Sequence, residues 1–232
     1  MSELRLSFPA SAIAGKGRLT ANDILLLQTE TFPDGITDTD GAALLFALHS
    51  ACRETCPEWA DFFIGSLTQF IVHHTFPQGS LDEANALWLE RMLAADGIIA
   101  SDLELKLLMH VMSVSAHVPD SLKVFAISQL RHAIHGGSGA YAGWRRGPQR
   151  GIDNGDIEFV KSVIAAGDAE LQSTSSALYR LLLSIDAITN PAQNENGWVR
   201  LLYTMRMSDQ ASRNERTATA RSSGRRSAGM AA

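Results

Sequence analysis

The sequence contains little cysteine, which excludes a scaffold built on disulfides. Only 2 of its 232 residues are cysteine. Cys52 and Cys56 lie four residues apart on one face of a predicted helix, a spacing that makes a disulfide between them awkward. We therefore expect two free thiols in a reducing compartment, with a redox pair as the alternative.

Long apolar runs and strand patterns are also missing. No stretch approaches the ~18 consecutive apolar residues of a membrane span. Residues 1–10 lack the uninterrupted apolar core of a signal peptide. The sequence thus predicts a cytoplasmic, helical protein without a membrane span.

Three common catalytic motifs are absent as well. We find no serine nucleophile elbow, no His-Glu metalloprotease helix and no phosphate-binding loop. The glycine-rich stretch 137–143 superficially resembles a dinucleotide loop, but it follows a predicted helix rather than a strand. We therefore expect a protein that is not an enzyme, although catalytic groups that converge from distant positions leave an uncharacterised activity open.

Charge is distributed unevenly along the chain. The formal net charge is -5. From Ser208 onward five arginines face only Asp209 and Glu215, which gives +3 for this tail and leaves -8 for the rest. A general nucleic-acid binder is usually basic, so this balance makes nucleic acid an unlikely partner.

Three landmarks recur in step along the sequence. Glycines 17, 79 and 151, aspartates 34, 96 and 168, and prolines 57, 119 and 191 are all separated by 62 and 72 residues. This shared offset predicts an all-α fold of three pseudo-repeats of about 60 residues, each with three helices, packed as one helical array or bundle.

The repeats divide the chain into six segments. These are an N-terminal extension at 1–16, helical repeats at 17–78, 79–135 and 151–207, a Gly/Arg-rich loop at 136–150, and a basic tail at 208–232. The tail contains no large apolar residue except Met230, so we expect it to be disordered when free.

Capping residues and apolar stripes support the predicted helices. Thr20, Asp82 and Asp153 each precede a polar residue by three positions, and Ser101 precedes Glu104 in the same way. The stripes we expect to face the core are, for the first helices, Ile24, Leu27 and Thr31; Leu87, Met92 and Leu93; and Ile157, Val160 and Ile164. For the second helices they are Leu44, Leu45 and Leu48; Leu107, Leu108 and Val111; and Leu178, Leu181, Leu182 and Ile185. For the third helices they are Trp59, Phe62, Phe63, Leu67 and Phe70; Leu122, Phe125, Leu130 and Ile134; and Trp198, Leu201, Leu202 and Met205.

Acidic turns follow the first helices at residues 32–40 and 95–102, with a weaker echo at 167–171. A helix, an Asp-Gly turn and a second helix form the outline of a calcium-binding EF-hand, although two ligand positions of that loop are unfilled here. Only the first turn has enough carboxylates for a divalent cation. Its candidate calcium or magnesium ligands are Glu30, Asp34, Asp38 and Asp40. Helix capping and turn formation are the alternative role of these residues.

Histidines occur only as pairs at the spacing of metal ligands. His73 and His135 occupy equivalent positions in two repeats, where a helix C-terminus favours a cation. A zinc site needs three or four convergent ligands, so we do not expect one from the histidines.

The Gly/Arg-rich loop combines aromatic side chains with arginines. Trp144, Arg145, Arg146 and Arg150 form a candidate site for nucleic acid or another anion, because such side chains stack on bases or bind phosphates. A solvated loop with Trp144 packed locally is the alternative.

The stretch Ala-Asp-Gly-Ile-Ile-Ala-Ser-Asp-Leu-Glu at 95–104 resembles the TerB-like (tellurite-resistance TerB) helical domains and the related N-terminal domains of membrane-anchored DnaJ-type co-chaperones. It is also similar to a degenerate EF-hand pair. The resemblance implies an all-helical bundle that serves in stress-response or sensing complexes, sometimes with a divalent metal bound by acidic residues. The acidic turn of the family corresponds to Asp34, Asp96 and Glu104, whereas Ala169 and Ser176 depart from it.

These observations favour a non-enzymatic interaction module that binds a protein partner in grooves between its second and third helices. The alternatives are a calcium- or magnesium-responsive protein that uses the first acidic turn, and a nucleic-acid-binding protein that uses the basic loop and tail. No cofactor is expected other than this divalent cation, and the sequence leaves the oligomeric state open.

Overall fold

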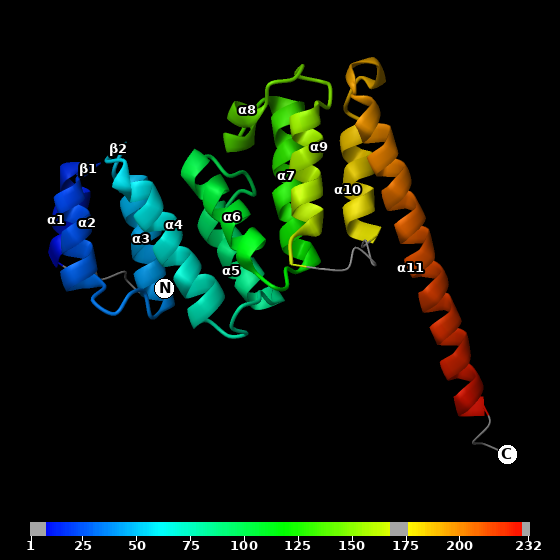
Figure 1. Cartoon of the computed structure of the whole chain (residues 1–232), viewed down its shortest axis with the longest axis horizontal. Coiled ribbons are helices and arrows are strands. Elements are labelled where there is room, and N and C mark those ends of the chain that lie inside the picture. The colour runs from blue at the N-terminus through cyan, green and yellow to red at the C-terminus, as the bar shows by residue number, and fades with distance from the viewer. Residues whose placement is uncertain (1–7, 168–175, 229–232) are drawn as a thin grey trace. The chain divides into compact units, whose positions relative to one another are not determined.

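The computed structural model describes residues 8–167 and 176–228, and helices dominate them (Figure 1). The all-α fold class is thereby confirmed. The chain divides into two compact units, Met1–Pro119 and Asp120–Ala232, called unit 1 and unit 2 below. Their boundary falls inside the predicted second repeat, immediately before its third helix.

Unit 1 contains six α-helices, two π-helical segments and two short strands among its described residues. In chain order these are α1 (Phe8–Lys16), β1 (Arg18–Leu19), α2 (Ala21–Leu26), η1 (Leu27–Thr31), α3 (Thr39–Ala51), β2 (Glu54–Thr55), α4 (Glu58–Thr68), η2 (Gln69–His74), α5 (Glu83–Leu93) and α6 (Asp102–Val114). The strands pair in parallel. With two residues each, they are too short to produce the alternating pattern by which a strand is recognised in a sequence.

The core of unit 1 is apolar and partly aromatic. Trp59 and Phe63 of α4 are fully buried, and the Phe63 ring meets Phe46 edge-on with 5.4 Å between ring centroids. Helix α4 also packs against α6. The stripe predicted for α5 is wrong at Leu87, which is exposed. The buried residues of that helix are Ala86, Leu89 and Leu93, which follow the helical spacing of three and four.

Unit 2 begins with a long helix and ends with the longest one. Its elements are α7 (Asp120–Gly136), α8 (Ala140–Trp144), α9 (Asn154–Ala165), α10 (Ser176–Asp186), the 3-10 turn η3 (Pro191–Gln193) and α11 (Asn196–Ala228). Helix α7 packs against α8, α9 and α10, and α11 packs against α9 and α10 (Figure 1). Trp198 is fully buried, and its Nε1–H donates to Asp186 Oδ1 across 2.9 Å. The indole thus ties α11 to the end of α10.

The predicted capping residues begin the helices as expected. Thr20, Asp82, Ser101 and Asp153 each accept a hydrogen bond from the backbone N–H three residues later. Gly97 adopts a φ of 83° in the second acidic turn, a conformation that glycine reaches without a side-chain clash. Residues 168–171 of the third acidic turn, predicted at 167–171, lie outside the described residues.

Helix α11 continues through Ala228, across the segment that composition predicts to be disordered from residue 208. Its first turns are fixed by Trp198, Met205 and Asp209, all buried. Beyond them alanines and arginines, which favour a helix, alternate with serines, threonines and Gly224, which do not, so the helix extends from this anchored start rather than by propensity alone. Helix α1 likewise occupies residues 8–16 of the predicted N-terminal extension.

Both cysteines are free thiols, as expected. They do not share a helix, however, because α3 ends at Ala51 and Cys56 follows β2. Burial raises the pKa of both thiols, which makes them poor nucleophiles. Across the parts of the chain that the structure describes, we find no helix with the length and apolar character needed to cross a membrane.

Candidate functional site

The first acidic turn separates its carboxylates. Glu30 lies in η1, Asp34 in the following turn and Asp40 in the first turn of α3, and all three are exposed. Asp38 instead caps α3, where its Oδ1 accepts a hydrogen bond of 2.7 Å from the Gly41 N–H. The capping role of Asp38 is therefore confirmed.

Metal-binding geometry is absent from the described residues. Within 8–167 and 176–228, no group of three or more His, Cys, Asp or Glu side chains lies close enough to hold a metal ion. In the second acidic turn the carboxylate of Asp96 is used by the backbone. Its Oδ1 accepts a hydrogen bond of 3.1 Å from the Ile98 N–H and so stabilises the turn itself. His73 and His135 lie in the last turns of η2 and α7, as predicted for helix C-termini.

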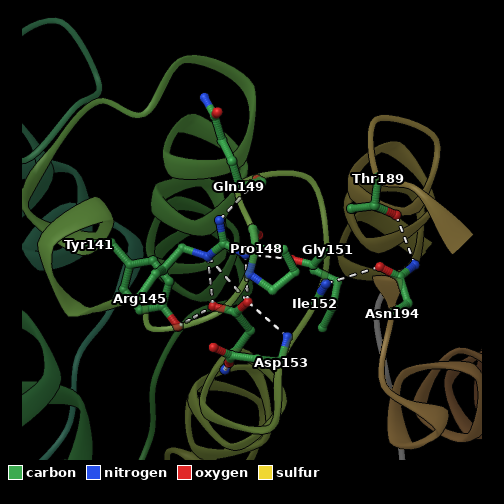
Figure 2. A network of polar contacts seen from close by, with 10 residues as sticks. Tyr141, Arg145, Pro148, Gln149, Gly151, Ile152, Asp153, Thr189 and Asn194 are labelled. Carbon is green, nitrogen blue, oxygen red and sulfur yellow. Dashed lines mark hydrogen bonds and ion pairs between the residues drawn. The ribbon is translucent and has the colours of Figure 1, made fainter. Parts of the chain in front are cut away.

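Arg145 is buried in unit 2 and cannot serve as the predicted anion contact. Only 6% of its side chain is exposed, and it pairs with the Asp156 carboxylate, which is 1% exposed. Its Nη2 and Nε lie 2.9 and 3.1 Å from the two carboxylate oxygens, a fork-to-fork arrangement. The same Nη2 also donates to the carbonyls of Pro148 and Gly151, and Nη1 donates to the carbonyl of Gln149 (Figure 2). The guanidinium donors are therefore used inside the protein.

The four residues of the predicted anion site thus separate into two groups. Arg146 and Arg150 are exposed. Trp144 is half-buried, and its ring lies 6.0 Å from the Tyr141 ring between centroids. The predicted local packing of Trp144 is confirmed, and two exposed arginines are left.

The same network holds the loop against the connection between α10 and α11. Tyr141 donates to Asp156 Oδ1 across 3.1 Å, and burial together with the Asp156 charge raises the pKa of this phenol. The Ile152 N–H donates to Asn194 Oδ1, as Figure 2 shows. At Gly151 a Cβ atom would lie 2.5 Å from the Gln193 carbonyl oxygen, so only glycine fits. The loop is therefore packed rather than solvated, and its buried polar groups serve its own structure.

In unit 1 the His49 ring lies between two polar partners. Its Nε2 is 2.7 Å from Ser101 Oγ, and the Trp59 Nε1–H donates to its Nδ1 across 3.3 Å. Because the indole N–H is only a donor, Nδ1 carries no proton and Nε2 carries one. The Nε2–H therefore donates to the serine oxygen.

This tautomer is the wrong one for nucleophilic catalysis. An activating histidine must accept the hydroxyl proton at the nitrogen that faces the serine, while an acceptor holds its other N–H. In His49 the nitrogen that faces the serine carries the proton, and the other nitrogen accepts a hydrogen bond instead of donating one. Burial also lowers the pKa of His49, in keeping with a neutral ring. The contact joins α3, α4 and the start of α6, so we assign it a structural role.

Helix α11 carries a second apolar face, opposite the one that packs into unit 2. Val199, Tyr203 and Met207 are 65%, 64% and 49% exposed. They repeat every four residues, so each lies about 40° further around the helix than the one before it. All three are on the side away from Trp198, Met205 and Asp209. We call these three residues the outer stripe. Arg200 and Arg206 are exposed and flank the outer stripe, each about 60° around the helix from its middle residue, Tyr203.

The two units also differ in net charge. Unit 1 contains 6 Lys and Arg against 15 Asp and Glu, a net charge of -9, and unit 2 contains 14 against 10, a net charge of +4. Helix α11 alone has seven arginines against Asp209 and Glu215. Asp209 is 7% exposed and bonds to Arg213 and Ser176, so it adds little negative charge to the outer surface.

Two of these features were not predicted from the sequence. The apolar pattern indicated the buried stripe of α11 but not the outer one, which a search for a second set of apolar residues spaced by four would have found. The contact between His49 and Ser101 joins residues 52 positions apart and leaves no local signal in the sequence.

The fold defines a mostly helical protein with two compact units. No protein-family model matches the chain, and searches of curated proteins and of solved structures find no match either.

Proposed function

We propose that the protein is a non-enzymatic interaction module, whose partner protein binds along the outer stripe of α11. The observation that supports this proposal is the exposure of Val199, Tyr203 and Met207 on the helix face that the fold does not use. Burying a large apolar side chain contributes about 1.5–3 kcal/mol, so a partner that covered these three neighbouring side chains would gain binding free energy from each. Binding in the grooves between second and third helices, expected from the sequence, stays a prediction.

The proposal includes the predicted organisation in three repeats. Its support is a backbone hydrogen bond that recurs between the segment before each first helix and the connection between the second and third helices. The three bonds are Arg53 N–H to Gly17 O (3.1 Å), Ala116 N–H to Gly79 O (2.8 Å) and Asn190 N–H to Arg150 O (2.7 Å). Helix α11 is the last helix of the third predicted repeat, and its outer stripe is the surface on which we place the partner.

Three further predictions concern catalysis, a divalent-cation site and the resemblance to TerB-like domains. The tautomer of His49 bears on its contact with Ser101 alone, so the absence of an enzymatic activity stays a prediction. A calcium- or magnesium-responsive function at Glu30, Asp34, Asp38 and Asp40 has no support from the geometry of the described residues. The resemblance to TerB-like domains, and with it a role in stress-response or sensing complexes, stays a prediction.

Photocrosslinking in cells tests the proposed function. A photoreactive amino acid replaces Tyr203 in one variant and Thr204 in the other, which is also exposed but lies about 100° around the helix. We expect a crosslinked partner protein from position 203, and its loss when Val199→Asp is added. Equal crosslinking from both positions, or none from either, would refute binding at the outer stripe.

A further inference from the structure

We infer that the partner segment is an acidic amphipathic helix that lies along α11, an inference that rests on the proposed function. The outer stripe suits a helix by its shape. Residues 199 to 207 span about 12 Å along the axis, and a facing helix presents apolar side chains at the matching three- and four-residue spacing.

The positive charges beside the outer stripe favour a partner with negative charges. Arg200 and Arg206 border the apolar residues on both sides, and both are exposed. A partner helix with carboxylates next to its apolar face would pair with these guanidinium groups. A basic helix of the same apolar pattern would meet like charges at both edges.

A second copy of the chain is a poorer occupant for the same reason. Pairing of α11 with α11 would place Arg200 and Arg206 of both copies around one apolar seam. Asp209, three residues beyond Arg206, is buried and already bonded. Glu195, exposed five residues before Arg200, is a single carboxylate against two arginines in each copy, so most of the like charge would remain uncompensated and oppose the association.

Nucleic acid would match the charge of α11 but not its apolar residues. Arginines on a helix contact phosphates readily. Val199 and Met207, however, gain little beside a phosphate backbone. A protein helix satisfies both the apolar and the basic features, so it is the occupant that the geometry favours.

Two synthetic peptides test this inference with the full-length protein. Both are fluorescently labelled helices with leucine at every apolar position, and they differ only in carrying glutamate or lysine elsewhere. Fluorescence anisotropy gives the dissociation constants at low and moderate salt. We expect the glutamate peptide to bind at least about tenfold more tightly than the lysine peptide, and its binding to weaken as salt increases.

Variants connect the binding to the outer stripe. Tyr203→Asp should weaken binding of the glutamate peptide about tenfold or more. Arg200→Glu combined with Arg206→Glu should reverse the preference toward the lysine peptide. Phe76→Asp is the matched control, because it removes an apolar side chain that is 87% exposed in unit 1, and it should change nothing. Circular dichroism checks that each variant remains folded.

The alternative outcomes are distinct. Equal binding of both peptides, or binding that Tyr203→Asp leaves unchanged, would overturn the inference. Tight binding of a single-stranded DNA oligonucleotide that depends on Arg200 and Arg206 but not on Tyr203 would overturn it in favour of a polyanion. A partner crosslinked at position 203 with no preference for the acidic peptide would leave the proposed function standing and refute the acidic helix alone.

Discussion

Glu104 and His49 both lie beside Ser101. Burial shifts the pKa of each in the direction that favours its neutral form. The pKa of Glu104 rises to about 7, against the opposing effect of a hydrogen bond from the Ser101 backbone. The pKa of His49 falls because its ring is buried among its neighbours. The two groups therefore give unit 1 opposite dependences on pH.

Replacement of Glu104 by glutamine should remove one of these dependences. The pKa is about 7 in the folded chain and 4.5 for an ordinary glutamate, so the folded state holds the proton more tightly. The stability gained is complete below pH 4.5 and is lost as the pH rises through 7. We expect Glu104→Gln to raise the free energy of unfolding at pH 8 by ~1 kcal/mol, a value discounted for partial exposure, and to change it little at pH 5. Urea denaturation at both pH values measures the difference.

The comparison needs a control because His49 acts in the opposite direction. Its contribution to stability is present above the ordinary histidine pKa of 6.5 and is lost as the pH falls below that value. Asp102→Asn changes an exposed carboxylate in the same first turn of α6 and should leave the pH dependence unaltered. If Glu104→Gln also leaves it unaltered, Glu104 is not the group that titrates.

At the scale of elements, the sequence predicted the regular parts of the fold better than the connections. Caps such as Asp153 and buried stripes such as that of Trp198 and Met205 depend on residues close in the chain, so their pattern is visible locally. The packing of the Arg145 loop depends on Asp156 and Asn194, and the latter is 42 residues from its partner Ile152. Composition alone therefore suggested an exposed anion site where the structure has a buried ion pair.

Breaking that ion pair should destabilise unit 2. Asp156→Asn leaves the Arg145 guanidinium buried without a counter-charge, and removal of one partner from such a pair typically costs about 3–5 kcal/mol. We expect a loss of about 3 kcal/mol in the free energy of unfolding, measured by urea denaturation. Lys161→Ala is the control on the same helix, since it removes only the exposed pair with Glu158 and should cost less than about 0.5 kcal/mol. Similar losses in both variants would contradict a structural role for the network.

At the scale of the whole molecule, the three-repeat pattern and the two compact units divide the chain at different places. The repeat boundary expected from the sequence lies after residue 135, whereas the compact units separate between Pro119 and Asp120. The landmarks on which the predicted repeats rest are glycines, aspartates and prolines of turns and caps. Such residues record how each helix begins and ends, but they carry no information about which helices share a core.

Two fragments of the chain distinguish these divisions. Fragment 120–232 keeps α7, which packs against α8, α9 and α10, whereas fragment 137–232 lacks it. We expect the longer fragment to unfold in one cooperative urea transition, and the shorter one to lose cooperativity because Leu122, Ala126 and Leu130 no longer complete the core. The outer stripe belongs to unit 2, so the longer fragment should also retain the crosslink at position 203. Cooperative unfolding of fragment 137–232 would instead support the repeat boundary as the structural one.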